Sequence, residues 1–192
     1  MQQQSNLYTA FVFTLGFAAA LSVLLSAQWL DATNGIQNKE YCAAGIRTIF
    51  SPGAQADFLR EISSSTQTLD VMLYQFSNPD LMQALASAAA RGTRVRIILE
   101  PRVDSNYATA EFLAARGVQV RFASKEYTNT HSKTAVIDAR KVLVGSTNWS
   151  RQAMRSNRES TVVVESAALA QEFLVVFEED WAKAKDFVPE NA

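Results

Sequence analysis

The chain has 192 residues, of which 48% are hydrophobic and 19% charged, and its formal net charge at pH 7 is −1. It contains one histidine and one cysteine, which excludes an intrachain disulfide and a transition-metal cluster built from these residues. No Walker, Rossmann or HExxH motif occurs, so the sequence predicts no metal and no cofactor.

The first 30 residues predict a membrane anchor. No charged side chain precedes Asp31, and residues 7–30 are mostly Ala, Leu, Phe and Val without proline. A helix of this length reaches about 36 Å, which exceeds the roughly 30 Å of a bilayer core. We therefore expect a retained single-pass anchor over residues 1–30. The alternative is a cleaved signal sequence ending near Ala27, which would make the rest of the chain secreted or periplasmic.

Residues 31–44 are the predicted linker to a single domain of residues 45–192. Lys39 and Arg47 follow the apolar segment and no basic residue precedes it, which favours a cytoplasmic domain but leaves the side of the membrane open. Cys42 lies in the linker. It could join two copies of the chain through an intermolecular disulfide, or remain a buried thiol, and the sequence does not decide its role.

The domain begins with alternating predicted strands and helices. Asn78 is the expected N-cap of a helix, with Pro79 in the first turn and Gly92 after the last turn. The strands are expected at residues 45–50, 69–76, 95–99 and 118–122, and the helices at 54–62, 81–91 and 106–116. A hairpin over 132–145 and a long helix over 167–184 complete the domain. This alternation is typical of an α/β domain whose sheet is mixed, mostly parallel and covered by helices on both faces.

The only histidine, His131, opens the array H-x-K-x-x-x-x-D, in which Lys133 and Asp138 are the other two marked residues. Strand alternation would place His131 and Lys133 on one side. Ser146 and Asn148 repeat the same i, i+2 spacing in the predicted hairpin, which would bring their hydroxyl and amide donors to the same anion. An imidazole nucleophile among cationic and amide donors suits attack on a phosphodiester.

The array resembles the HKD signature of the phospholipase D superfamily. The chain is similar to members with a single motif, which include bacterial nucleases and membrane-anchored cardiolipin hydrolases or nucleases. The resemblance implies an α/β/α sandwich and a covalent phosphohistidine. That chemistry uses one histidine as nucleophile and a second as acid. Because this chain has only His131, the resemblance implies a homodimer that shares one site.

The resemblance also implies roles for individual residues. Lys133, Ser146 and Asn148 would bind the phosphate. Glu159, which opens an apolar strand over residues 160–164, would accept a hydrogen bond from His131 and complete the catalytic set. Asp138 would be a structural residue that pairs with a positive charge.

The substrate class stays open at the level of sequence. Residues 91–158 hold 13 Lys and Arg against 5 Asp and Glu, and this excess suits a lipid headgroup or a nucleic-acid backbone. Arg151, Arg155 and Arg158 follow Asn148 and are the candidates to face the substrate. The predicted anchor favours phospholipid. Metal-independent cleavage of single-stranded nucleic acid is the alternative, and a membrane-tethered scaffold with an inactive site is the third reading.

Overall fold

The computed structural model describes residues 43–188. The predicted anchor over residues 1–30, most of the predicted linker and Cys42 lie outside this range. Within residues 43–188, no helix is both long and apolar enough to cross a membrane.

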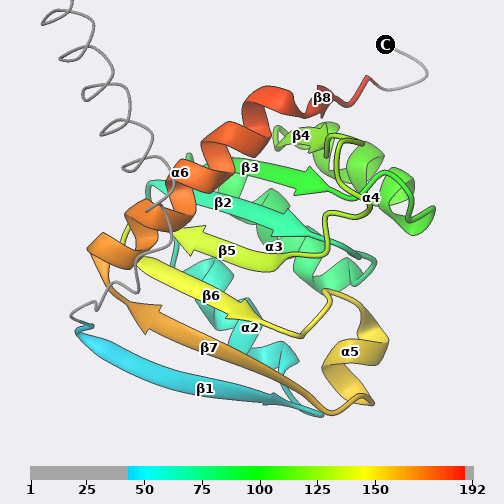
Figure 1. Cartoon of the computed structure of the whole chain (residues 1–192). Coiled ribbons are helices and arrows are strands. Elements are labelled where there is room, and N and C mark those ends of the chain that lie inside the picture. Colours follow the sequence, from blue (N-terminus) through cyan, green and yellow to red (C-terminus); the bar gives the residue numbers. More distant parts are fainter. Residues whose placement is uncertain (1–42, 189–192) are drawn as a thin grey trace, which may run out of the picture. The chain divides into compact units, whose positions relative to one another are not determined.

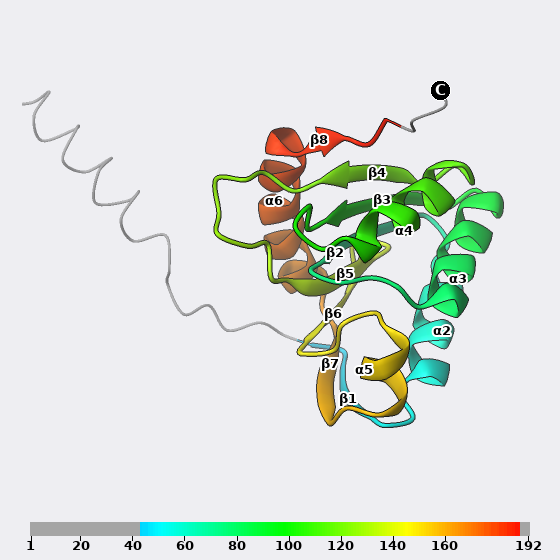
Figure 2. The same ribbon diagram turned by 90° about the vertical axis from the view of Figure 1, so that its right-hand side faces the viewer.

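One eight-stranded sheet forms the middle layer, and its strand order is β1-β7-β6-β5-β2-β3-β4-β8. The strands are β1 (Gly45–Ser51), β2 (Thr68–Leu73), β3 (Arg94–Leu99), β4 (Gln119–Phe122), β5 (Lys133–Ile137), β6 (Lys141–Gly145), β7 (Glu159–Glu165) and β8 (Lys185–Asp186). The helices are α2 (Gln55–Ser63), α3 (Pro79–Ala90), α4 (Ser105–Ala114), α5 (Arg151–Arg155) and α6 (Ala167–Lys183). Helices α2, α3 and α4 cover one face and α6 crosses the other (Figures 1 and 2), which confirms the expected α/β/α layers.

The expectation of a mostly parallel sheet is wrong, although the sheet is mixed as predicted. Only the β2–β3 and β3–β4 pairings are parallel. The other pairings are antiparallel. Helical crossovers α3 and α4 link the three parallel strands. After β4 the chain returns through an irregular loop and adds β5 beside β2, and a tight turn then joins β5 to β6.

Local signals in the sequence agree closely with the helix ends. The Asn78 side chain accepts a hydrogen bond from the Asp80 amide at 3.0 Å, which confirms it as the N-cap of α3. Gly92 and Gly117 follow α3 and α4 with φ of 95° and 81°, a conformation that glycine adopts without steric cost. Helix α5 and strand β8 were not expected, because each is only one turn or one residue pair long.

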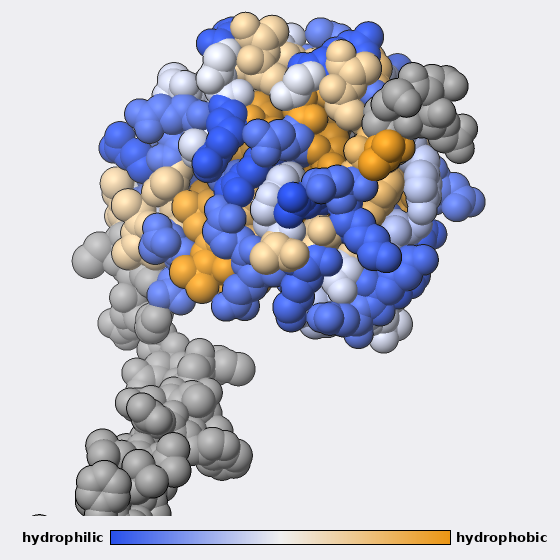
Figure 3. Space-filling view, turned by 90° about the horizontal axis from the view of Figure 1, so that it is seen from above, coloured by the Kyte–Doolittle hydropathy of each residue, from blue (hydrophilic) through white to orange (hydrophobic). Residues whose placement is uncertain are grey.

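The main core lies between the sheet and helices α2, α3 and α4, and it includes Trp149. The Trp149 ring packs edge-on against Phe58 and Phe76, at 5.8 and 5.3 Å between ring centroids. Its backbone bonds to the segment after β2, donating to Gln75 O and accepting from the Ser77 and Asn78 amides. Trp149 and Met154 are therefore core residues. On the outside, hydrophilic residues cover most of the face in Figure 3, and apolar ones gather in small areas.

Asp138 is structural, but among residues 43–188 it does not form the ion pair with a positive charge that the sequence predicts. It lies in the β5–β6 turn with φ of 52°. Its carboxylate accepts hydrogen bonds from the backbone amides of Thr66, Gln67 and Thr68, which lead into β2. Burial raises the pKa of Asp138, but these hydrogen bonds outweigh it and hold the pKa below its usual range.

We predict that Asp138→Ala lowers the free energy of unfolding by about 1–3 kcal/mol, since three amides lose a charged acceptor. Asp138→Asn keeps a residue type that tolerates positive φ, so it should cost less. Because the native pKa is depressed, the carboxylate stabilises the fold above its unfolded pKa, and this contribution is lost as pH falls through the folded pKa. Denaturant unfolding of the three proteins at neutral and acid pH tests this, and equal stability of all three at neutral pH would contradict it.

Candidate active site

The predicted site residues come together at one end of the sheet. Lys133, the first residue of β5, pairs with Leu73, the last of β2. Gly145, the last residue of β6, pairs with Thr161 near the start of β7. These strand ends meet at the right-hand end of the sheet in Figure 1, which faces the viewer in Figure 2. Asp138 lies at the opposite end of β5, about 17 Å away at the usual rise of a strand.

Lys133 and His131 are in direct contact. The Lys133 ammonium lies 3.0 Å from His131 Nδ1 and 3.3 Å from Nε2, and it donates to the His131 carbonyl at 2.7 Å. The Tyr74 ring packs against the imidazole at 4.3 Å between centroids. The same ammonium lies 5.0 Å from the Tyr74 ring centroid. The i, i+2 spacing therefore places a cation against an accessible imidazole, as the sequence predicts.

The Lys133 ammonium is a charge held largely out of water. The residue is only 9% exposed. Burial lowers the pKa of Lys133 below its usual value, and the negative charge of Glu159 partly opposes this shift. No carboxylate within residues 43–188 lies in salt-bridge contact with it. A buried cation without a counter-ion in contact favours an incoming anion.

Glu159 contacts different residues from those expected. Its carboxylate accepts hydrogen bonds from Ser146 Oγ at 2.5 Å and Asn157 Nδ2 at 3.0 Å. The expected bond from His131 to Glu159 does not occur in the described part of the chain. Gly145 allows the end of β6 to lie close to the start of β7, because a Cβ on this residue would be only 2.1 Å from the Ser160 carbonyl oxygen. Glu159 thus orients Ser146 and acts on Lys133 through its charge.

Asn148 is held by the Trp149 backbone bonds described above. Its Oδ1 is buried and lacks a hydrogen-bond partner among residues 43–188. An asparagine amide carries two N–H donors as well as this oxygen. Only these N–H groups could donate to an anionic ligand, since the oxygen is an acceptor and is shielded from solvent.

Glu100 fixes the loop that leads into His131. It is fully buried, directly after β3. One carboxylate oxygen accepts from the Thr130 amide at 2.6 Å, and the other binds the Arg102 guanidinium at 2.8 Å. Arg102 in turn donates to the Tyr127 carbonyl at 3.1 Å. The residue before His131 is therefore tied to the end of β3 across 30 positions of sequence.

The predicted arginine cluster is only partly free to meet a substrate. Arg155 lies in α5 and points to Gln55 at 3.2 Å and Asp80 at 3.7 Å. Arg151 and Arg158 are exposed and make no ion pair within residues 43–188. Two of the three cations therefore remain available near Asn148.

Comparison with known proteins identifies the family. Residues 58–181 match the family model described as "Cardiolipin synthase, PLD-like domain". The chain belongs to the phospholipase D superfamily. It is 32% identical over 143 residues to the mitochondrial cardiolipin hydrolase of Homo sapiens, covering 74% of this chain and 56% of that protein. The chain thus spans little more than half the length of that relative.

Two further relatives of this phospholipase D member are similar over most of their length. The phospholipase D of Rickettsia conorii is 26% identical over 203 residues, covering 96% of this chain and 98% of that protein. The crystal structure of Nuc, a phospholipase D family member from Salmonella typhimurium, superposes with a TM-score of 0.72 at 28% identity. It matches 76% of this chain and 99% of its own. The likeness to Nuc supports the α/β fold with a mixed sheet.

Three residues at or beside this site are not predicted from the sequence. Tyr74 ends an apolar strand run, where an aromatic residue looks like core. Asn157 lies two residues before Glu159, so the i, i+2 rule that linked the other pairs could have found it. Glu100 follows a buried strand directly, and a charge in that position is a usable signal.

We predict that Glu159→Gln moves the alkaline limb of the pH–kcat/KM profile to lower pH. If Lys133 binds a phosphate oxygen it must stay protonated, and the Glu159 charge raises its pKa against the effect of burial. Without that charge the Lys133 pKa falls further, so activity is lost at lower pH. The profile on a soluble phosphodiester tests this, with Glu165→Gln, at the other end of β7, as the control. An alkaline limb that stays in place in Glu159→Gln would show that Glu159 does not act on Lys133.

Proposed function

We propose that this protein is a phosphodiester hydrolase that acts through a phosphohistidine on His131 in a homodimer, with phospholipid as the favoured substrate. The observation that carries the proposal is the buried Lys133 ammonium 3.0 Å from the His131 ring, at a sheet end lined by further donors. Membership of the phospholipase D superfamily supports the reaction type.

The reaction takes two steps. His131 attacks phosphorus, a P–N bond forms, and the bond to the leaving oxygen breaks as the partner's His131 gives that oxygen a proton. Water, deprotonated by the partner's His131, then attacks phosphorus and releases the first imidazole. Lys133, Asn148 and Ser146 hold the non-bridging oxygens and stabilise the added charge. Glu159 acts as a positioning residue through Ser146 and through the charge of Lys133.

Three observations support phospholipid over nucleic acid: the cardiolipin hydrolase and phospholipase D names among the curated relatives, the apolar N-terminal segment, and the ion pairs that occupy many basic residues. Much of the positive excess in residues 91–158 is neutralised by ion pairs within the described range. The paired cations are Arg94, Arg96, Arg102, Arg121, Lys141 and Arg155. Single-stranded nucleic acid is the second candidate, favoured by the exposed Arg151 and Arg158 beside the site.

We predict that the protein hydrolyses cardiolipin or phosphatidylcholine in vesicles with chelator present, and that His131→Asn abolishes turnover while leaving the fold intact. Loss of the nucleophile should cost at least about three orders of magnitude in kcat. The measurement is product release from vesicles, with single-stranded DNA and RNA in parallel. Cleavage of a strand without lipid turnover would reverse the substrate ranking. A His131→Asn protein as active as the wild type would reject the mechanism.

The shared site predicts how activity depends on subunit mixing. When wild-type and His131→Asn chains are mixed equally and allowed to exchange, only pairs of two wild-type chains hold two imidazoles. Activity should therefore fall to about one quarter, against about one half for independent subunits. Activity that follows the wild-type fraction linearly would exclude a site built from two chains.

A further inference from the structure

A cavity of about 270 Å³ lies between α6 and the sheet, next to the proposed catalytic pair. Its apolar lining residues are Met72, Val136, Phe173, Val176 and Phe177, and Glu172 of α6 also lines it. Ser132, which lies between His131 and Lys133 in the chain, also lines this cavity. The cavity and the phosphate-binding end of the sheet are therefore built on the same segment of β5.

The cavity wall changes in polarity along the strand. At the catalytic end, the hydroxyls of Ser132 and Thr134 lie 3.2 Å apart. Along β5 these hydroxyls are followed by Val136, while on β2 the apolar Met72 pairs with Thr134 and Asp70 pairs with Val136. From Ser132 to Val136 the wall extends about 13 Å at the usual strand rise.

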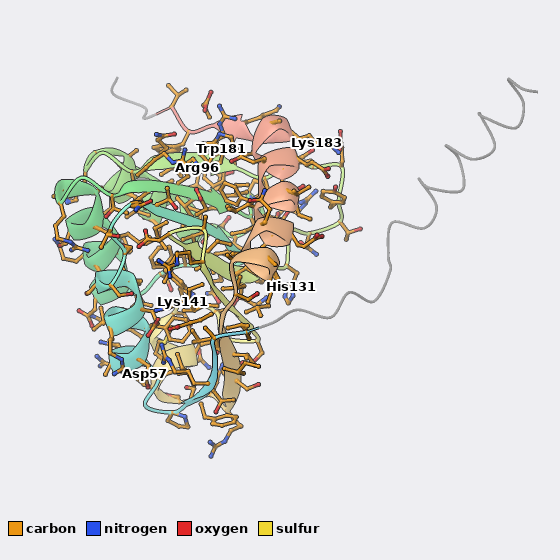
Figure 4. The ribbon with its side chains drawn as sticks, turned by 90° about the vertical axis from the view of Figure 1, so that its left-hand side faces the viewer. Asp57, Arg96, His131, Lys141, Trp181 and Lys183 are labelled. Carbon is orange, nitrogen blue, oxygen red and sulfur yellow. The ribbon has the colours of Figure 1, made fainter. Side chains whose placement is uncertain are left out.

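Asp70 closes the far end of the cavity. Its carboxylate binds Arg96 Nε at 2.6 Å and lies 3.8 Å from the Arg94 guanidinium. Arg96, labelled beside Trp181 in Figure 4, also pairs with Glu178 at 2.6 Å. A charged, ion-paired end wall stops an apolar ligand, so the cavity accepts a chain of limited length.

The solvent side of the cavity carries exposed valines on α6 together with one exposed carboxylate, Glu172. Val176 and its neighbour Val175 on α6 are 55% and 49% exposed. Exposed valines beside an apolar cavity suit contact with lipid. A nucleic-acid strand offers charge and flat bases, and neither fits an apolar slot.

We propose that this cavity holds one acyl chain of the phospholipid whose phosphate binds at His131 and Lys133. The proposal rests on the proposed function. The phosphate lies at the sheet end, the glycerol ester reaches the Ser132 and Thr134 hydroxyls, and the chain runs under α6 towards Asp70. The slot selects single acyl chains and makes kcat/KM depend on their length.

The direct test is binding of alkyl phosphates of increasing chain length to the wild-type protein, measured by calorimetry below micelle formation. Affinity should rise about fourfold per methylene group, from roughly 0.8 kcal/mol per buried CH₂, and then stop rising once the chain reaches the Asp70 wall. Inorganic phosphate is the reference without a chain. An affinity independent of chain length would overturn the slot.

Val176→Arg and Val175→Arg form a matched pair, because both residues are exposed neighbours on α6 and only Val176 lines the cavity. We expect Val176→Arg to remove the chain-length dependence and to lower kcat/KM on long-chain phospholipid at least about tenfold. The same variant should leave hydrolysis of bis(p-nitrophenyl) phosphate unchanged, and Val175→Arg should change neither.

Other results separate the possible failures. Equal losses of vesicle hydrolysis in Val176→Arg and Val175→Arg would mean that this surface of α6 contacts lipid in general, and would overturn the slot. Dissociation of the dimer in Val176→Arg, seen by sedimentation, would mean that a second copy of the chain covers the cavity, which also overturns it. Chain-length-dependent binding without hydrolysis of any diester would reject the proposed function and keep the slot.

Discussion

A lysine ammonium buried beside an imidazole, with no carboxylate of residues 43–188 in contact, is the constraint around which this site is organised. Lys133 is 9% exposed, and its hydrogen bonds go to the ring and the carbonyl of His131. A carboxylate in direct contact would stabilise the cation but would occupy the place of an anionic ligand. Glu159 instead accepts hydrogen bonds from Ser146 and Asn157, and its negative charge raises the pKa of Lys133. The positive charge is thus retained and remains available to a phosphate.

The H-x-K-x-x-x-x-D array spans a single strand, β5, and the residues at its two ends have different roles. Lys133 begins β5 at the ligand end, and Asp138 follows its last residue at the other. The aspartate holds the β5–β6 turn against the start of β2 by accepting three backbone amides. One motif therefore supplies the proposed reacting groups and also ties the strand that carries them to β2. The length of β5 separates Asp138 from the proposed phosphate site.

The two faces of β5 have different roles, one in the core and one at the cavity under α6. Ala135 and Ile137 contribute to the core shared with α2, α3 and α4. Thr134 and Val136 face α6 and line the apolar cavity. Because side chains alternate along a strand, a short segment can place a phosphate site at its end and an apolar slot on one face.

The sequence by itself determined the features that depend on near neighbours. These include the Asn78 cap, the glycines after α3 and α4, the hairpin, and the spacing that joins His131 to Lys133. Only the tertiary structure decided that the sheet is mostly antiparallel in its pairings, that Asp138 binds amides, that Tyr74 packs on His131 and that Glu100 holds Thr130. The physical reason is sequence separation. Contacts between residues tens of positions apart depend on which strand is added beside which, and local periodicity carries no information about that choice.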